Sequence, residues 1–498
     1  MPSARSTRPA GSRRSFSAAS LILRPASSCL DAGGRAFIGR VQDIGAASRA
    51  FLLPDAALRY NAGMHAPRPL PLLPALPAAT LLAYAGAHFG KSLLWYTGEL
   101  LLIFALTEHA GLDAIAAGCA VAAGLLLSAA MGLLAARRWG AGTSLAWAGR
   151  SQWRGIALAA LSLLLLFLVP LLPASTRLGC VLLLSLPFRA AYAVGDVAQN
   201  ALLGLGRWPW RGARGVSALR LIGSGLAAVS ISAAIGLVLQ THQSSAPWTA
   251  LVVVAMVSSI ALLSAAWLRQ ALRPYTQALS PAQHTTPATA RQADQLSTFA
   301  VMALLCCALP TFTKLAPYLA QSRIGAPGWC SAILMGYALG TVAVQPLAAR
   351  WRTNALPRLA GSGAVLAALG MSFAAAAGHA LWLNTAMAFG MGMAGGSAGQ
   401  WVWARHAELS CQQPAQHAAG VARLTACAQV ALALGSILIG LMLNLGDGQG
   451  RGHVDLAWAM AAGPMLCGTG CVLLAYANGL RNRLNRRPLA KSGLAPRA

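Results

Sequence analysis

Long apolar stretches recur along this chain from about residue 77 to residue 479, separated by short polar breaks. A helix needs about 20 apolar residues to cross the hydrocarbon core of a bilayer, and there only helices and closed barrels pair all their backbone groups. The stretches predict an all-α polytopic membrane protein with twelve transmembrane helices. We expect these spans at 77–107, 113–136, 155–174, 178–204, 216–240, 247–268, 296–321, 327–348, 357–378, 380–403, 418–444 and 455–479.

Charged residues are few, at 10% of the chain, where a soluble domain carries about 25%. The formal net charge of +27 could suggest a nucleic-acid partner, but Lys and Arg lie in alternate connections between the apolar stretches rather than on one helix face. We therefore expect no nucleic-acid binding, and the positive-inside rule places both termini in the cytoplasm. The clusters are Arg137, Arg138, Arg150 and Arg154; Arg207, Arg211 and Arg214; Arg350, Arg352 and Arg358; and Arg481 to Arg497.

Composition divides the chain into five parts. Residues 1–76 are an extension rich in Arg, Ser and Pro; it is either a disordered or transit-like segment or an over-long gene start, with Met64 as the alternative start. Residues 77–268 and 296–480 are expected to form two six-helix halves, joined by a cytoplasmic linker at 269–295 and followed by a basic cytoplasmic tail at 481–498. Two such halves predict a solute site between them near the bilayer midplane.

Two ionisable residues lie inside the first predicted span. Lys91, Trp95 and Glu99 follow at four-residue steps and so share one face of a helix. A charged side chain in hydrocarbon costs at least a few kcal/mol, which makes Lys91 and Glu99 candidates for a functional site. At 1.5 Å per residue they are about 12 Å apart along the axis, too far for a direct pair. Each therefore needs a separate partner or a water-filled cavity.

The fourth predicted span carries a second stripe, with Arg189, Tyr192 and Asp196 at i, i+3 and i+7. We expect this stripe to face a central cavity and Asp196 to pair with Lys91 or with Arg220 of the fifth span; a purely structural pair is the alternative. Lys91, Arg189 and Arg220 would then give the cavity a positive bias suited to an anionic or zwitterionic solute.

Neutral and aromatic side chains complete the candidate site. Asn200 is a candidate hydrogen-bond donor to the solute, while Trp95 and Tyr192 either stack on a ring of the solute or serve packing alone. Lys314 of the seventh span lies between Pro310 and Pro317. It is expected either to line the cavity or to extend its long side chain to the membrane interface.

Several segments of the first half agree in order and spacing with a known family. HFGKSLLWYT (88–97) is followed by LTEHAGL (106–112), RRWG (137–140), YAVGDVAQNALLG (192–204) and SALR (217–220). Over about 140 residues this pattern resembles the glycoside-pentoside-hexuronide cation symporters of the major facilitator superfamily, the melibiose-carrier-like family. The resemblance implies a twelve-helix secondary transporter that moves a sugar-like solute together with sodium ions or protons.

Carried over by motif, the resemblance implies solute-binding roles for Lys91, Asp196 and Arg220. The family has a sugar-binding acid on the first helix beside its lysine, and that position is Ser92 in this chain. A hydroxyl can donate and accept hydrogen bonds but carries no charge. The resemblance therefore implies that Ser92 lies at the solute site without the acid's charge.

The coupling residues of the family also differ in this chain. Its two cation-site acids of the second helix fall on Gly124 and Ser128. With both acids replaced, we expect H+ as the coupling ion, and Glu99 and Asp196 as the candidate proton-coupling residues. The alternative for Glu99 is that it only hydrogen-bonds a neighbouring helix.

No enzyme signature accompanies these residues in the sequence. It contains no phosphate-binding loop, no His cluster or group of convergent acids, and no metal-ligand spacing among its ten cysteines. We expect a monomeric secondary transporter of the bacterial inner membrane, without cofactor or metal, moving a small polar, anionic or sugar-like solute with protons. The alternatives are an exporter or uniporter of the same fold, and a transporter-like sensor or scaffold that does not transport.

Overall fold

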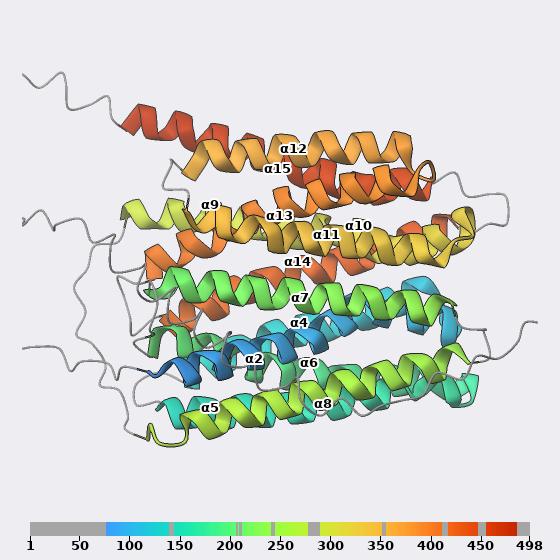
Figure 1. Ribbon diagram of the computed structural model, residues 1–498, viewed down its shortest axis with the longest axis horizontal. Helices are drawn as coiled ribbons and strands as arrows, with labels where there is room; N and C mark the ends of the chain where they lie inside the picture. The colour runs from blue at the N-terminus through green and yellow to red at the C-terminus, as the bar shows by residue number, and fades with distance from the viewer. Residues whose placement is uncertain are drawn as a thin grey trace, which may run out of the picture. The chain divides into compact units, whose positions relative to one another are not determined.

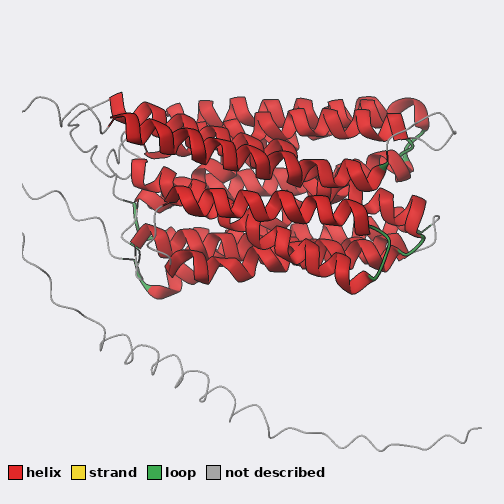
Figure 2. Cartoon of the chain, turned by 90° about the horizontal axis from the view of Figure 1, so that it is seen from above, coloured by secondary structure: helices red, strands yellow, loops and turns green. Residues whose placement is uncertain are grey.

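The computed structural model describes residues 76–138, 144–205, 208, 212–240, 245–276, 289–350, 355–410, 417–446 and 455–485. Within these ranges the regular structure is helical and contains no strand, as Figure 2 shows. The prediction of an all-α polytopic fold is therefore confirmed for the described residues. The extension up to residue 75, residues 277–288 of the expected linker and the tail from residue 486 lie outside them.

The helices lie side by side along the long axis of the bundle (Figure 1). The first helix set is α2 (Ala78–Tyr96) continued by η2 (Thr97–Leu101), α3 (Leu102–Phe104) and η3 (Ala105–His109); α4 (Ala114–Arg138); α5 (Leu145–Leu166) with η4 (Val169–Leu171); α6 (Ala174–Leu205); α7 (Gly212–Gln240); and α8 (Ala246–Leu272). The second helix set is α9 (Thr289–Ala308), α10 (Pro310–Leu319) with η5 (Ala320–Ile324), α11 (Pro327–Arg350), α12 (Ala355–Ala376), α13 (Leu381–Ser410), α14 (His417–Gly446) and α15 (Leu456–Asn485).

Eleven helices in the described part of the chain are long and apolar enough to cross a membrane. They include the segment Ala78–His109 and the segment Gln295–Ser322, in which α9 and α10 meet at Pro310. The tenth predicted span corresponds to α13, a helix of 30 residues that is not among the eleven. It carries the buried polar residues Asn384, Ser397 and Gln400, which lower its apolarity, yet it packs between α11 and α12.

Helix packing joins the two sets into one bundle. Within the first set, α2 packs on α7 and α8, and α5 on α6 and α8; within the second, α12 packs on α13 and α15. Between the sets, α4 packs along α14 and α7 along α11. All described helices belong to one compact unit, so the division into two six-helix halves stays a prediction.

Glycines allow α4 and α14 to approach closely. A Cβ added at Gly440 of α14 would lie 2.7 Å from the Ala114 carbonyl oxygen of α4, and one added at Gly118 would lie 2.8 Å from the Ser436 carbonyl oxygen. Small residues of this kind are what bring membrane helices into backbone contact, since apolar side chains gain little by leaving lipid. This interface therefore leaves no room for a side chain at either position.

Gly440→Ala is expected to lower the free energy of unfolding by about 1–3 kcal/mol, because the new methyl group must push α4 and α14 apart. Gly399→Ala is the matched control, since a Cβ at Gly399 meets nothing within 4 Å. Unfolding of both variants in detergent would be compared with that of the unaltered protein. Equal stability of the two variants would contradict the close packing of α4 on α14.

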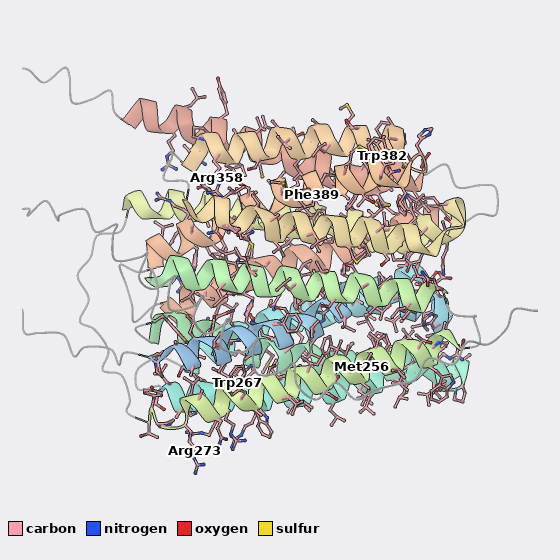
Figure 3. The ribbon with its side chains drawn as sticks, in the orientation of Figure 1. Met256, Trp267, Arg273, Arg358, Trp382 and Phe389 are labelled. Carbon is pink, nitrogen blue, oxygen red and sulfur yellow. The ribbon has the colours of Figure 1, made fainter. Side chains whose placement is uncertain are left out.

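The outer surface and one end of the bundle have different chemistry. Met256, Trp267 and Trp382 are more than half exposed and lie on the outside of the bundle, where lipid would surround them (Figure 3). Arg273 and Arg358 lie at the end where α2 begins, which we call the Ala78 end; the opposite end is the His109 end (Figure 3). Arginines at α-helix boundaries thus gather at the Ala78 end, the pattern that the positive-inside rule describes.

Candidate functional site

A central cavity of about 380 Å3 lies between helices of both sets. Its lining comes from α2, η2, α6 and α7 of the first set and from α9, α10, α11, α13 and α14 of the second. Six of the residues expected at the site line this cavity: Lys91, Ser92, Trp95, Tyr192, Asp196 and Arg220. The remaining three, Glu99, Arg189 and Asn200, are buried outside the lining.

Lys91 and Asp196 form an ion pair in the cavity wall. The Lys91 Nζ lies 2.5 Å from the Asp196 Oδ1, and the Asn200 amide donates to the other carboxylate oxygen at 2.9 Å. Asn200 is one helical turn beyond Asp196 on α6, so its side chain lies beside the carboxylate and orients it. Asp196 therefore pairs with Lys91 and not with Arg220, the other partner that the sequence allowed. Asn200 hydrogen-bonds the carboxylate and does not line the cavity.

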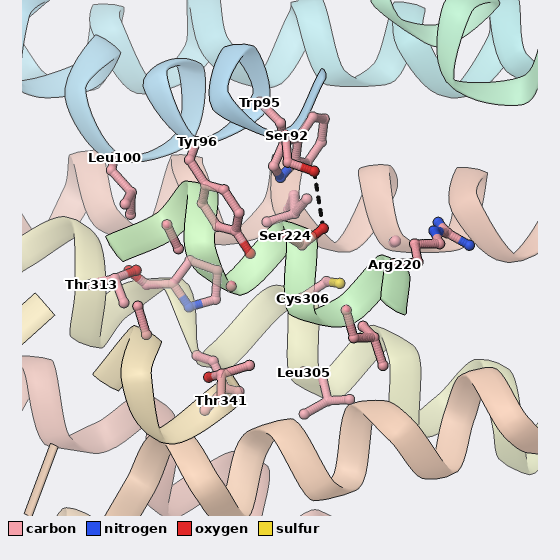
Figure 4. A pocket seen from close by; sticks show the side chains of 18 of the residues that line it. Ser92, Trp95, Tyr96, Leu100, Arg220, Ser224, Leu305, Cys306, Thr313 and Thr341 are labelled. Carbon is pink, nitrogen blue, oxygen red and sulfur yellow. Dashed lines mark hydrogen bonds between the residues drawn. The ribbon is translucent and has the colours of Figure 1, made fainter. Parts of the chain in front are cut away.

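A chain of neutral hydrogen bonds continues this wall. Ser224 of α7 lies 3.0 Å from the Ser92 hydroxyl and 3.0 Å from the His88 Nε2 (Figure 4). Ser92 therefore lies at the solute cavity, in contact with α7. Ser224 was not predicted from the sequence. Its position four residues after Arg220 on α7, which places both side chains on the same helix face, was the available signal.

Arg220 lines the cavity without an acidic partner. Its guanidinium lies over the Trp403 ring of α13, 4.2 Å from the centroid, within the range of a cation–π contact. No carboxylate of the described residues lies within ion-pair distance of it. Of the three cations expected to bias the cavity, Arg220 alone among the described residues retains an unneutralised charge at the lining, because Lys91 is paired and Arg189 is not exposed to the cavity.

A second buried charge cluster surrounds Glu99. One carboxylate oxygen lies 2.7 Å from the Arg189 Nη2 and the other lies 2.8 Å from the Lys314 Nζ. Exposed fractions are 5% for Glu99 and 1% for each cation, so these charges are almost entirely removed from solvent. As the eight-residue spacing predicts, Lys91 and Glu99 have separate partners. The expectation that Arg189 faces the cavity is wrong, because its guanidinium pairs with Glu99 outside the cavity lining.

The backbone of the first helix is adapted to this cluster. Glu99 lies in the π-helical turn η2, and such turns leave carbonyl groups less tightly paired. The Arg189 Nη2 donates to the Gly98 carbonyl oxygen at 3.3 Å, and its guanidinium lies 5.2 Å from the Trp95 ring centroid. A Cβ at Gly124 would lie 2.9 Å from the Arg189 Cγ. Gly124 therefore provides room for Arg189, and Glu99 supplies a carboxylate to it.

Lys314 connects the two helix sets. It projects from α10 of the second set, pairs with Glu99 of the first set, and donates to the Ser436 hydroxyl of α14 at 3.2 Å. Its side chain is buried outside the cavity lining. Both sequence-based interpretations, cavity lining and extension to the interface, are therefore wrong. Neither hydropathy nor spacing could indicate a carboxylate partner on a helix so distant in the chain.

Metal and thiol chemistry have little support in the described residues. Among them, no three His, Cys, Asp or Glu side chains come together as a candidate metal site. The buried Ser128 of α4 has a hydroxyl without a hydrogen-bond partner. The eight cysteines of the described part are free thiols, and Cys306 lines the central cavity.

Comparison with known proteins gives limited information. No family model matches the sequence, and no curated protein matches it. A match among solved structures is the human organic anion transporter MFSD10 (TETRAN), with 14% sequence identity and a TM-score of 0.47, covering 80% of this chain and 99% of that chain. The melibiose-carrier-like resemblance stays a prediction. The geometry of this chain is therefore the basis for its proposed function.

Proposed function

We propose that this protein is a secondary active transporter of the major facilitator type, which moves a small polar solute, anionic or sugar-like, across a membrane. The observation that carries the proposal is the central cavity, which combines charged side chains of the first set with aromatic side chains of both sets. A polar cavity between membrane-length helices is expensive to maintain, and in membrane proteins such intramembrane charges mark solute or ion paths. Solute would bind between the sets and be released on the other side when they rock.

Contacts between the sets suggest how the cavity opens. Toward the His109 end, the Thr107 hydroxyl lies 2.7 Å from the Tyr318 hydroxyl, and Glu99 pairs with Lys314. Toward the Ala78 end, Arg220 of α7 lies against Trp403 of α13. Alternating access would break one group of contacts at a time while α4 and α14 stay packed. The two groups therefore act as opposing gates in this proposal.

Proton coupling would reside at Glu99. In the observed arrangement the carboxylate holds Lys314 across the two sets. A proton on Glu99 would remove the charge that attracts Lys314, so the contact would weaken and the sets could separate toward the His109 end. In this scheme solute uptake is coupled to H+. An exporter or uniporter would use the same cavity with a different coupling. A transporter-like sensor would bind the solute without moving it.

The proposed location is the bacterial inner membrane, with the Ala78 end and both termini facing the cytoplasm. The gathering of basic residues at that end supports this orientation, because positively charged connections are retained on the cytoplasmic side. A monomer suffices for the proposal, since the cavity is complete within one chain.

The experiment that tests the proposed function is a ligand-stabilisation screen of the purified protein over sugars, organic acids and amino acids, followed by countertransport in liposomes. Asp196→Asn is expected to shift the set of stabilising solutes toward those with more negative charge, because Lys91 loses its neutralising partner in the cavity wall. Asp113→Asn is the matched control, since Asp113 is exposed at the start of α4. If a solute binds but is not exchanged in liposomes, the transporter proposal is rejected and the transporter-like sensor is favoured.

A further inference from the structure

The two sides of the central cavity differ in chemistry. Each charged side chain among its described lining residues comes from the first helix set: Lys91, Asp196 and Arg220. The second set contributes no charged side chain among the described lining residues; it contributes an apolar cluster, defined by Met302, Leu305, Leu309, Leu334 and Leu432, together with neutral polar side chains such as Thr341 and Gln429. A solute that fills the cavity therefore meets charge on one side and an uncharged, largely apolar wall on the other.

Among the charged side chains of the described lining residues, one cation has no carboxylate partner and is available to bind the solute. Lys91 and Asp196 neutralise each other, and both oxygens of the carboxylate have donors. Arg220 has its guanidinium carbon over the Trp403 ring and no carboxylate partner among the described residues, which leaves its N–H groups for an acceptor on the solute. A planar guanidinium binds a carboxylate through two parallel hydrogen bonds. The lining thus matches a solute with a single anionic group.

Arg220 lies near one end of the cavity. In Figure 4, Ser92 and Ser224 lie on the way to it, while Leu100 and Thr313 lie at the other end. The cavity therefore has its unpaired cation at one end. A solute bound by Arg220 would extend its remaining part along the apolar wall.

We propose that the solute is an amphipathic monoanion, whose carboxylate binds Arg220 beside Trp403 and whose apolar body lies against Met302, Leu305 and Leu309. This inference rests on the proposed function and narrows its solute class. It disfavours highly hydroxylated neutral sugars, because Met302, Leu305 and Leu309 would leave hydroxyl groups that lie against them without hydrogen-bond partners. It also excludes dianions, for which the lining provides no second unneutralised cation among its described residues.

The test uses a series of phenylalkanoates, from benzoate to 4-phenylbutanoate, with their neutral primary amides. Binding is measured by calorimetry on the full-length protein in lipid nanodiscs, with empty nanodiscs correcting for partition into lipid. We expect each added methylene to strengthen binding about fourfold while the apolar wall accommodates it. We expect each amide to bind at least about tenfold more weakly than its acid.

Three variants assign these effects to residues. Arg220→Gln is expected to weaken binding of the acids by about 10–100-fold and leave the amides unchanged, so that the preference for the acid disappears. Arg154→Gln is the matched control, because Arg154 is exposed outside the cavity. Leu305→Gln is expected to reduce the gain per methylene while keeping the preference for acid over amide.

Equal binding of acids and amides, or a preference that survives Arg220→Gln, would overturn the proposal. Affinity that does not change along the series would overturn it as well. Counterflow of a neutral sugar in liposomes, without binding of any acid, would reject the solute class while transport stands. Acid binding with the expected variant effects but without counterflow would support the solute class and reject transport.

Discussion

Glu99→Gln is expected to lower the free energy of unfolding by about 3–5 kcal/mol, because it leaves Arg189 and Lys314 buried without a carboxylate. Glutamine keeps the shape of the side chain, so the loss reflects charge rather than a cavity. The comparison is Lys314→Gln, which leaves Glu99 and Arg189 as a matched pair and should cost far less. Denaturant unfolding of both variants in mixed detergent micelles measures the difference.

The double variant Glu99→Gln with Lys314→Gln provides the decisive control. It removes one charge of each sign and leaves Arg189 as the single buried cation of the cluster, where Glu99→Gln leaves two, so it should be more stable than Glu99→Gln alone. Such non-additivity is expected for residues in direct contact. If the double variant loses the sum of the two single effects, the Glu99–Lys314 ion pair does not exist in the folded protein.

Lys314→Gln is expected to abolish proton-driven accumulation while solute counterflow continues. Without Lys314, a proton on Glu99 no longer changes a contact between the two helix sets, whereas the lining of the cavity is intact. In liposomes with an imposed pH gradient, the variant should bring internal solute only to the external concentration. A pH-sensitive dye inside the liposomes should report solute-linked proton movement for the unaltered protein and none for the variant.

Lys314→Arg is the conservative control for this prediction. It keeps a cation opposite Glu99 and should retain part of the proton-driven accumulation, although the planar guanidinium hydrogen-bonds differently from an ammonium group. Undiminished accumulation by a folded Lys314→Gln protein would remove Lys314 from the coupling mechanism. The same result with Glu99→Gln would remove Glu99.

Much of the fold could be predicted because its signals are local. Each apolar stretch contains its own helix, since backbone groups in hydrocarbon must pair within the segment. The predicted span at 380–403 is a helix, α13, but it is not among the eleven apolar enough to cross a membrane, because glycines and buried polar residues reduce its apolar character. The π-helical turn at Thr97–Leu101 left no sequence signal, because it accompanies contacts that Gly98 and Glu99 make with other helices.

The site could be predicted in part from helix periodicity. Spacing indicated that Lys91 and Glu99 share a face and that Tyr192 and Asp196 share another, and the lining includes Lys91, Tyr192 and Asp196. Periodicity could not tell that the Arg189 guanidinium lies outside the cavity lining, because that depends on the room at Gly124 and on the position of Glu99. Ser224 and Trp403 were missed because neither carries a charge that makes it unusual in an apolar helix.

The sequence by itself determined an all-α membrane protein, the approximate extent of its helices and a set of buried ionisable residues. These follow from local hydropathy and from the cost of placing charge in hydrocarbon. Only the tertiary structure decided the partners: Lys91 with Asp196, 105 residues away, and Glu99 with both Arg189 and Lys314. Pairing depends on which helices touch and in what register, and this is set by packing along the whole bundle. The tertiary structure thereby separated a solute cavity with one unneutralised arginine from a buried charge cluster that links the two helix sets.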